Sequence, residues 1–126
     1  MVGIVLVSHS KPLADALVDY TKMMAPQATV VAAGGLDDGS FGTSYDKIES
    51  AIEQVNGPDG VLVLVDMGSA VMTTKMVLED LEDDKVQIVD CPFVEGAVQA
   101  TVLAQGGSTR AEMLESLNTL YQTRKL

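Results

Sequence analysis

The single histidine of the chain, His9, is the residue best suited to carry chemistry. It lies two positions after an apolar run, Gly3 to Val7, and just before a helical pattern that begins near Pro12. A histidine has an ordinary pKa of about 6.5, so at neutral pH one ring nitrogen has a free lone pair. That lone pair can take up a proton or attack a phosphorus atom. The alternative is a polar loop residue that caps the following helix.

Asp66 is a candidate partner for this histidine. It directly follows Val61 to Val65, the clearest strand pattern in the sequence, and it lies at the same sheet edge as His9 if the two strands pair. A carboxylate that accepts from one ring N–H fixes the tautomer and turns the other nitrogen outward. A contact to the nearer nitrogen would leave Nε2 as the nucleophile. Asp66 could also cap the helix that follows Gly68 and Ser69, and the two roles are compatible.

Two glycine-containing turns could bind an anion. Gly68 and Ser69 begin a helix directly after a strand, and Gly39, Gly42 and Thr43 precede another helix. Free N–H groups at such positions favour negative charge, although these glycines could equally be simple turn formers. The P-loop pattern and the Rossmann glycine pattern are both missing from the sequence. We therefore do not expect this chain to hold a nucleotide by itself.

Composition narrows the function classes. The chain has 8 basic and 18 acidic residues and a formal net charge of −10. Nucleic acids and anionic membrane surfaces both require basic surfaces, so neither is an expected partner. One cysteine, Cys91, excludes an internal disulfide and a multi-cysteine zinc site. We expect Cys91 to be a buried structural thiol and we expect no metal site.

The length and the hydropathy pattern suggest one soluble domain. A chain of 126 residues is typical of a single domain, here residues 1–126. No signal peptide and no apolar run of about 20 residues are visible, which predicts a cytoplasmic location.

Short β-branched runs alternate with amphipathic stretches, and this alternation predicts a doubly wound α/β fold with a mainly parallel, open sheet flanked by helices. The expected strands are 3–7, 28–33, 61–65 and 86–89. The first expected helix begins at Pro12 and ends before Pro26, and the second begins near Thr43 or Ser44 and ends before 56–58. Three further helices are expected over roughly 70–81, 94–104 and 109–121. In such folds ligands bind at the carboxyl ends of the strands, where His9, the 34–43 loop, 66–69 and 91–96 all converge.

Five ordered sequence blocks resemble one known family. They are Val5 to Ser10, Ala32 to Asp38, Gly42-Thr43, Val65 to Ala70, and Pro92 to Ala97. Together they are similar to the phosphotransferase subunit of the phosphoenolpyruvate-dependent dihydroxyacetone kinase, which is related to the IIA component of mannose-type phosphotransferase systems. The resemblance covers essentially the whole chain.

The resemblance implies a homodimeric phosphocarrier domain of the mannose-type IIA fold. His9 would accept a phosphoryl group from the histidine-containing phosphocarrier protein and pass it to ADP on the nucleotide-binding subunit of the kinase. This chain would bind no cofactor itself, because ADP and ATP are held by the partner. Asp66 would be the partner carboxylate, and Ser10, Gly42, Thr43, Gly68 and Ser69 would bind the phosphoryl group. Because the sequence ends at Leu126, the phosphate is expected from a separate protein.

Three other functions remain as alternatives. The chain could be the IIA component of a mannose-type sugar transporter, but such proteins typically carry glycine after the histidine and a Gly-Gly-Ser-Pro turn after the aspartate. Here Ser10 follows His9, and the turn reads Asp66-Met67-Gly68-Ser69-Ala70. The chain could also be a hydrolase or an isomerase that uses His9 as a general base together with Asp66. A non-catalytic regulatory module would also satisfy the fold.

Overall fold

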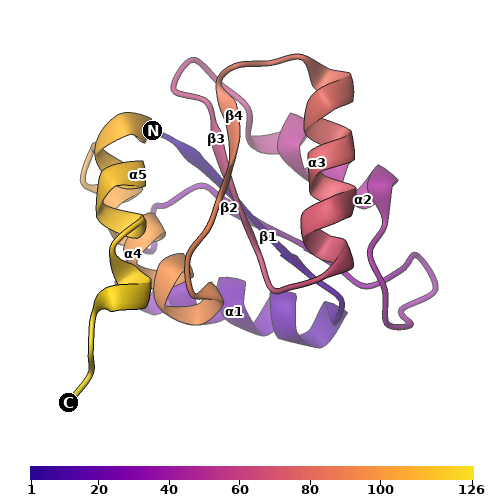
Figure 1. The fold of residues 1–126 in the computed structure, drawn as a ribbon, viewed down its shortest axis with the longest axis horizontal. Helices are drawn as coiled ribbons and strands as arrows, with labels where there is room; N and C mark the ends of the chain where they lie inside the picture. Colours follow the sequence, from indigo (N-terminus) through magenta and orange to yellow (C-terminus); the bar gives the residue numbers. More distant parts are fainter.

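Four parallel strands form the centre of the molecule in the computed structural model, which describes all residues 1–126. The strands are β1 (Gly3–Ser8), β2 (Val30–Gly34), β3 (Val61–Val65) and β4 (Val86–Val89), in the order β2-β1-β3-β4 (Figure 1). The helices are α1 (Lys11–Met24), α2 (Tyr45–Val55), α3 (Ser69–Leu81), α4 (Phe93–Gln105) and α5 (Arg110–Leu117). The predicted doubly wound α/β fold is confirmed.

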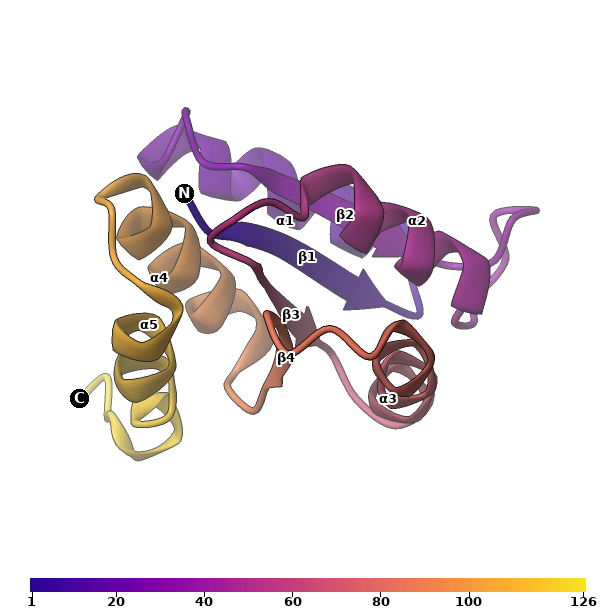
Figure 2. The ribbon, with the colours of Figure 1, turned by 90° about the horizontal axis from the view of Figure 1, so that it is seen from above.

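Helices cover both faces of the sheet because its central strands are apolar on both sides. On one face, Ile4 and Leu6 of β1 pack in a core with α1, α4 and α5. On the other face, Val5 and Val7 pack in a second core with α2 and α3. Figure 2 shows α4 and α5 on one side of the strands and α3 on the other. The two cores hold the central strands between rigid layers.

The strand order reverses between β1 and β3. From β1 the chain continues outward to β2, whereas from β3 it continues in the opposite direction to β4. The loops after β1 and β3 therefore diverge and leave their carboxyl ends open, at the position where doubly wound folds bind ligands. Val7 of β1 pairs with Val65 of β3 in the parallel register. This register brings His9 and Asp66 to one place at the sheet edge.

Two predicted elements differ from the observed ones. The strand expected at 28–33 spans Val30–Gly34, because the Ala28 N–H bonds back to Ala25 in a turn before the strand begins. The helix expected at 109–121 ends at Leu117, its last buried apolar residue, and a short 3₁₀ turn follows at Leu120–Gln122. A capping box formed by Thr109 and Glu112 begins this helix.

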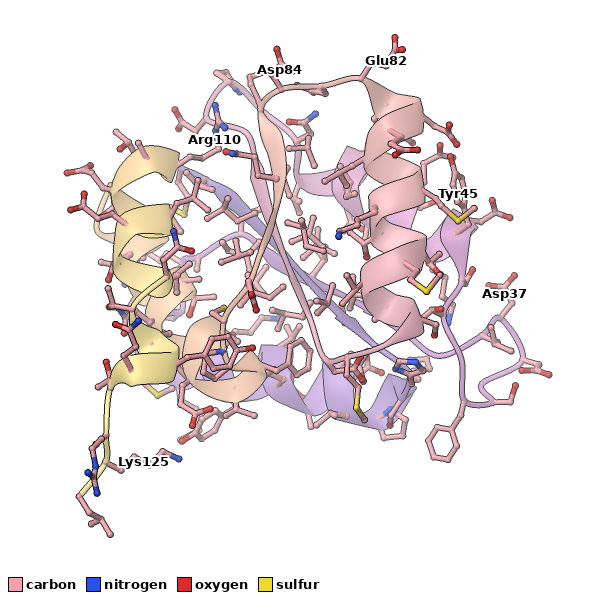
Figure 3. All side chains as sticks on the ribbon, in the orientation of Figure 1. Asp37, Tyr45, Glu82, Asp84, Arg110 and Lys125 are labelled. Carbon is pink, nitrogen blue, oxygen red and sulfur yellow. The ribbon has the colours of Figure 1, made fainter.

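The opposite end of the sheet is closed by polar contacts and takes no part in the candidate site. Arg110 of α5 donates to the Asp59 carbonyl at 2.9 Å and to the Gln87 side chain at 2.7 Å (Figure 3).

Cys91 is buried as predicted, and burial raises the pKa of its thiol to about 11. No helix combines the length and the apolar composition that a membrane crossing requires.

Thr74 of α3 has a fully buried hydroxyl without a hydrogen-bond partner. We expect Thr74→Val to raise the free energy of unfolding by about 1 kcal/mol, because a similarly shaped apolar side chain removes the desolvation cost of that hydroxyl. Urea unfolding would measure the change. The control is Thr101→Val, where the buried hydroxyl bonds to the Ala97 and Val98 carbonyls, so no stabilisation is expected. Equal effects of the two substitutions would contradict this explanation.

Candidate functional site

The backbone of His9 is held from two sides. Its N–H donates to Asp66 Oδ2 at 3.0 Å, and its carbonyl accepts from the N–H of Gly42 at 3.0 Å. The first bond ties the loop after β1 to the end of β3, and the second ties it to the loop after β2. The helix cap that could have occupied His9 belongs instead to Ser10, whose hydroxyl accepts from the Leu13 N–H. The histidine ring is therefore free for other contacts.

The imidazole ring faces the Asp66 carboxylate through its nearer nitrogen. His9 Nδ1 lies 3.0 Å from Asp66 Oδ1 and 3.2 Å from Oδ2. Because an ionised carboxylate can only accept, Nδ1 carries the proton and Nε2 has the lone pair of the neutral ring. The ring is 32% exposed and the carboxylate 14%. The predicted pairing thus turns Nε2 away from Asp66 and leaves the carboxylate more shielded than the ring.

Four groups donate to the Asp66 carboxylate. Besides the His9 ring and the His9 N–H, these are the Met67 N–H at 2.6 Å and the Ser8 hydroxyl at 2.9 Å. Burial raises the pKa of Asp66. The hydrogen bonds from the His9 and Met67 N–H groups and from the Ser8 and His9 side chains lower it by more than burial raises it, so the pKa lies below the ordinary value of 3.8. Asp66 is therefore a carboxylate at neutral pH and can hold the Nδ1 proton.

The outward nitrogen of His9 contacts a short series of hydroxyls. Nε2 lies 2.7 Å from the Ser69 Oγ, which is 3.1 Å from the Thr43 Oγ1. Thr43 Oγ1 lies in turn 3.1 Å from the Thr73 Oγ1 on α3. These hydroxyls come from the loop before α2 and from the first two turns of α3. They surround the side of the ring where an incoming group would bind.

The turn before α3 depends on Gly68. This glycine has φ 55° and ψ −119°, a backbone conformation that residues with a Cβ rarely adopt. It forms the N-cap of α3 and allows the helix to begin at Ser69, beside the His9 ring. The helix has no side-chain cap, so the alternative role of Asp66 as a capping residue is not observed.

The structure brings together most of the residues predicted for the site. His9, Asp66, Thr43 and Ser69 are linked by hydrogen bonds, and Gly42 and Gly68 shape the two turns beside them. Ser10 lies next to His9 in the chain, but its hydroxyl caps α1.

Ser8 and Thr73 also join the hydrogen-bond network of the site, and the sequence analysis did not single them out. Ser8 donates to Asp66 and accepts from the Ser10 N–H at 3.0 Å. Its position beside His9 was a usable signal. Thr73 could not be chosen before the contact between α2 and α3 was known.

The two lysines that begin or follow the loops near the His9 ring are bonded to other groups. Lys11, at the start of α1, is paired with Asp15 at 2.6 Å, and Lys47 of α2 donates to the carbonyls of Gly34 and Leu36. Neither cation contacts the ring nitrogens. None of the five cavities of the molecule is lined by His9 or Asp66; the one of about 430 Å³ lies between α1 and α2. The site is an open surface with one oriented ring nitrogen.

We expect Asp66→Asn to lower the free energy of unfolding by about 1–3 kcal/mol at pH 7, because four donors lose an ionised acceptor. The folded-state pKa of Asp66 lies below 3.8, so its contribution is present above about pH 4 and is lost as the pH falls through the folded-state value. Urea unfolding of both proteins from pH 7 to pH 3 should show the difference narrowing. Asp19→Asn, which removes an exposed carboxylate of α1, controls for net charge. A difference independent of pH would contradict the assignment.

Comparisons with known proteins identify the family of the chain. Residues 3–114 match the family model described as PTS system fructose IIA component. A PTS-dependent dihydroxyacetone kinase phosphotransferase subunit from Lactococcus lactis is 37% identical over 118 residues, with 94% of each chain covered. A phosphoryl donor subunit of a PEP-dependent dihydroxyacetone kinase from Providencia stuartii is 33% identical, covering 99% of this chain but only 28% of that protein.

Similarity of structure extends to phosphotransferase proteins of lower identity. A phosphotransferase system component EIIA from Streptococcus agalactiae has a TM-score of 0.71 at 18% identity, covering 94% of this chain and 91% of that one. At this identity the match supports the fold alone. It agrees with the predicted mannose-type IIA architecture.

Proposed function

Because the chain belongs to the PTS IIA family and, within it, to the phosphotransferase subunits of phosphoenolpyruvate-dependent dihydroxyacetone kinase, we propose that it carries a phosphoryl group on His9 Nε2. The observation that carries the proposal is the pairing of Nδ1 with Asp66 at 3.0 Å, which leaves the Nε2 lone pair directed outward. The proposed donor is the histidine-containing phosphocarrier protein. The proposed acceptor is ADP held on the nucleotide-binding subunit of the kinase.

In the first step Nε2 attacks the phosphorus of the donor phosphohistidine. The Nε2–P bond forms, the N–P bond of the donor breaks, and the donor histidine leaves with the electron pair of that bond. The Nδ1 proton stays on the ring of His9, which then has substituents on both nitrogens and gains positive charge. The shielded carboxylate of Asp66 offsets that charge, and its low pKa keeps it ionised throughout.

The return step needs the same parts. An oxygen of the ADP β-phosphate attacks the phosphorus, the Nε2–P bond breaks, and the electron pair returns to Nε2. Phosphoryl transfer of this kind requires in-line positioning and charge stabilisation more than covalent chemistry by the protein. Neither Lys11 nor Lys47 contacts Nε2, so no cation near the ring would hold the phosphoryl group in place. This fits a carrier, because the phosphoryl group must leave as readily as it arrives. The hydroxyls of Ser69 and Thr43 are placed to donate to its oxygens.

Exposed apolar side chains beside the site support macromolecular partners. Phe41 is 80% exposed and precedes Gly42; Met67 is 70% exposed and follows Asp66; Met72 is also 70% exposed, one turn after Ser69. We call these three side chains the apolar rim. Such a cluster is typical of a surface that another protein covers. We propose that the donor protein and the nucleotide-binding subunit dock here in turn, and that the chain forms a homodimer through another face.

The phosphoryl-carrier proposal predicts a specific labelling pattern. Incubated with labelled phosphoenolpyruvate and the general phosphotransferase proteins, the wild-type chain should acquire acid-labile phosphate, and His9→Ala should acquire none. Asp66→Asn should react more slowly by about a hundredfold or more, because the ring tautomer is no longer fixed. Labelled His9→Ala would contradict the proposal.

The same labelled protein distinguishes the two phosphotransferase branches. Adding the ADP-loaded kinase subunit should remove the label and form ATP. Label that stays on the chain in this arm, but moves to the next component of a mannose-type sugar transporter, would favour the transporter alternative.

The apolar rim predicts an effect on docking alone. Phe41→Ser and Met67→Ser should each raise the KM for the phosphocarrier protein by about tenfold, because burial of a large apolar side chain on binding is lost. Labelling by phosphoramidate, a small donor that needs no docking, should be unchanged. Met23→Ser is the matched control, since Met23 is 78% exposed near the far end of α1. An equal effect of Met23→Ser on KM would contradict docking at the rim.

A further inference from the structure

We infer that Thr73 is a positioning residue for His9 and that the hydroxyls of Ser69, Thr43 and Thr73 form a switch which covers and uncovers the Nε2 lone pair. The inference deepens the proposed function and rests on it. Thr73 touches neither the ring nor the reacting atoms; it acts through Thr43, which in turn contacts Ser69.

The protonation of the ring fixes the direction of every bond in this series. Asp66 only accepts, so Nδ1 donates to it and Nε2 must accept. The Ser69 hydroxyl therefore donates to Nε2 at 2.7 Å, which leaves its oxygen free to accept. Thr43 donates to Ser69 at 3.1 Å and accepts from Thr73 at 3.1 Å. In this arrangement all three hydrogens point towards the ring.

This arrangement blocks the reaction. The lone pair that must attack phosphorus is occupied by the Ser69 hydrogen, at the short distance of 2.7 Å. For Nε2 to react, that hydrogen must turn away. The same oxygens allow it, because a hydroxyl both donates and accepts: Ser69 can donate to Thr43 if Thr43 donates to Thr73. Rotation of the hydroxyl hydrogens thus frees the Nε2 lone pair and keeps the three hydroxyls bonded to one another, while the Ser69 side chain turns aside to make room for the phosphorus.

Thr73 is the last acceptor in the uncovered state. Without this hydroxyl, the covered state loses a donor to the Thr43 oxygen, whereas the uncovered state leaves the Thr43 hydrogen without a side-chain acceptor. An unmatched donor is the costlier of the two, so the loss disfavours the uncovered state. Thr73 is half-buried, one helical turn after Ser69, and contacts the loop before α2 through Thr43. The helices α2 and α3 are joined by the Tyr45 hydroxyl, which donates to Asp80. Figure 3 labels Tyr45 on α2. This second link holds the spacing of the helices when the Thr73 hydroxyl is removed.

The neighbouring threonine supplies a contrast. Thr74 is adjacent to Thr73 on the same helix, but its buried hydroxyl makes no hydrogen bond. The two positions have the same residue type and nearly the same place in the chain. Only Thr73 is connected to the ring.

The test uses phosphoramidate, which transfers its phosphoryl group to histidine without a docking protein. The Nε2–P bond forms, the P–N bond of the donor breaks, and ammonia leaves. Thr73→Val should slow this step by about 2- to 10-fold, the value expected for one neutral hydrogen bond. Thr73→Ser should restore the wild-type rate, and Thr74→Val should not change it. A wild-type rate in Thr73→Val, or a Thr73→Ser rate as slow as that of Thr73→Val, would overturn the inference.

A second readout separates the switch from a loss of structure. The ¹⁵N chemical shift of Nε2 in the unphosphorylated protein reports whether the lone pair accepts a hydrogen bond. Because Thr73→Val disfavours the uncovered state, the shift should move towards the hydrogen-bonded value. A merely loosened site would move it in the opposite direction, and that result would overturn the inference. If Thr73→Val does not fold, Thr73→Ala takes its place in both measurements.

The two proposals can fail separately. If the wild-type chain reacts with phosphoramidate but takes no label from the phosphocarrier protein, the proposed function is wrong while the switch stands. If the chain is labelled by its partner but Thr73→Val behaves as wild type in both readouts, the switch is wrong and the proposed function stands.

Discussion

The contact between His9 Nδ1 and the Asp66 carboxylate is the interaction on which the rest of the site depends. It selects one ring tautomer, turns Nε2 away from the carboxylate and provides the negative charge that would balance the proposed phosphorylated ring. The same carboxylate accepts from two backbone N–H groups and from Ser8, so it cannot turn away from the histidine without losing several bonds. These bonds also keep the pKa of Asp66 low, and the carboxylate is therefore negatively charged at neutral pH.

The fold meets the geometric demand of this pair with a reversal of strand order. β1 and β3 are adjacent and parallel, and the chain leaves them in opposite directions, so their carboxyl ends remain uncovered. Apolar cores on both faces of the sheet fix the register of the two strands. A slip of one residue would turn Val7 and Val65 to the other face and separate the histidine from its carboxylate. Packing far from the surface thus determines the distance at which the reacting group is held.

Much of this arrangement could be predicted from the sequence, and the parts that could not share a cause. The strand 61–65 was predicted with its exact bounds because its run of Val and Leu has one interpretation, and Asp66 was placed by that strand. The end of α5 was placed too late, because the residues after Leu117 could continue a helix but have no apolar surface to pack on. Thr73 was missed because its role depends on how α3 lies against the loop before α2, which no local pattern specifies.

The acidic composition and the open site together describe a protein that works through others. A net charge of −10 and an open surface at His9 fit the proposed role, in which partners bring the phosphoryl group and hold its acceptor. The most direct test of this account is to locate the phosphorus in the protein labelled from phosphoenolpyruvate, by ³¹P and ¹⁵N NMR of the histidine ring. The account predicts a single phosphorus bonded to Nε2 of His9, with the proton retained on Nδ1. Phosphorus on Nδ1, or on any other residue, would contradict it.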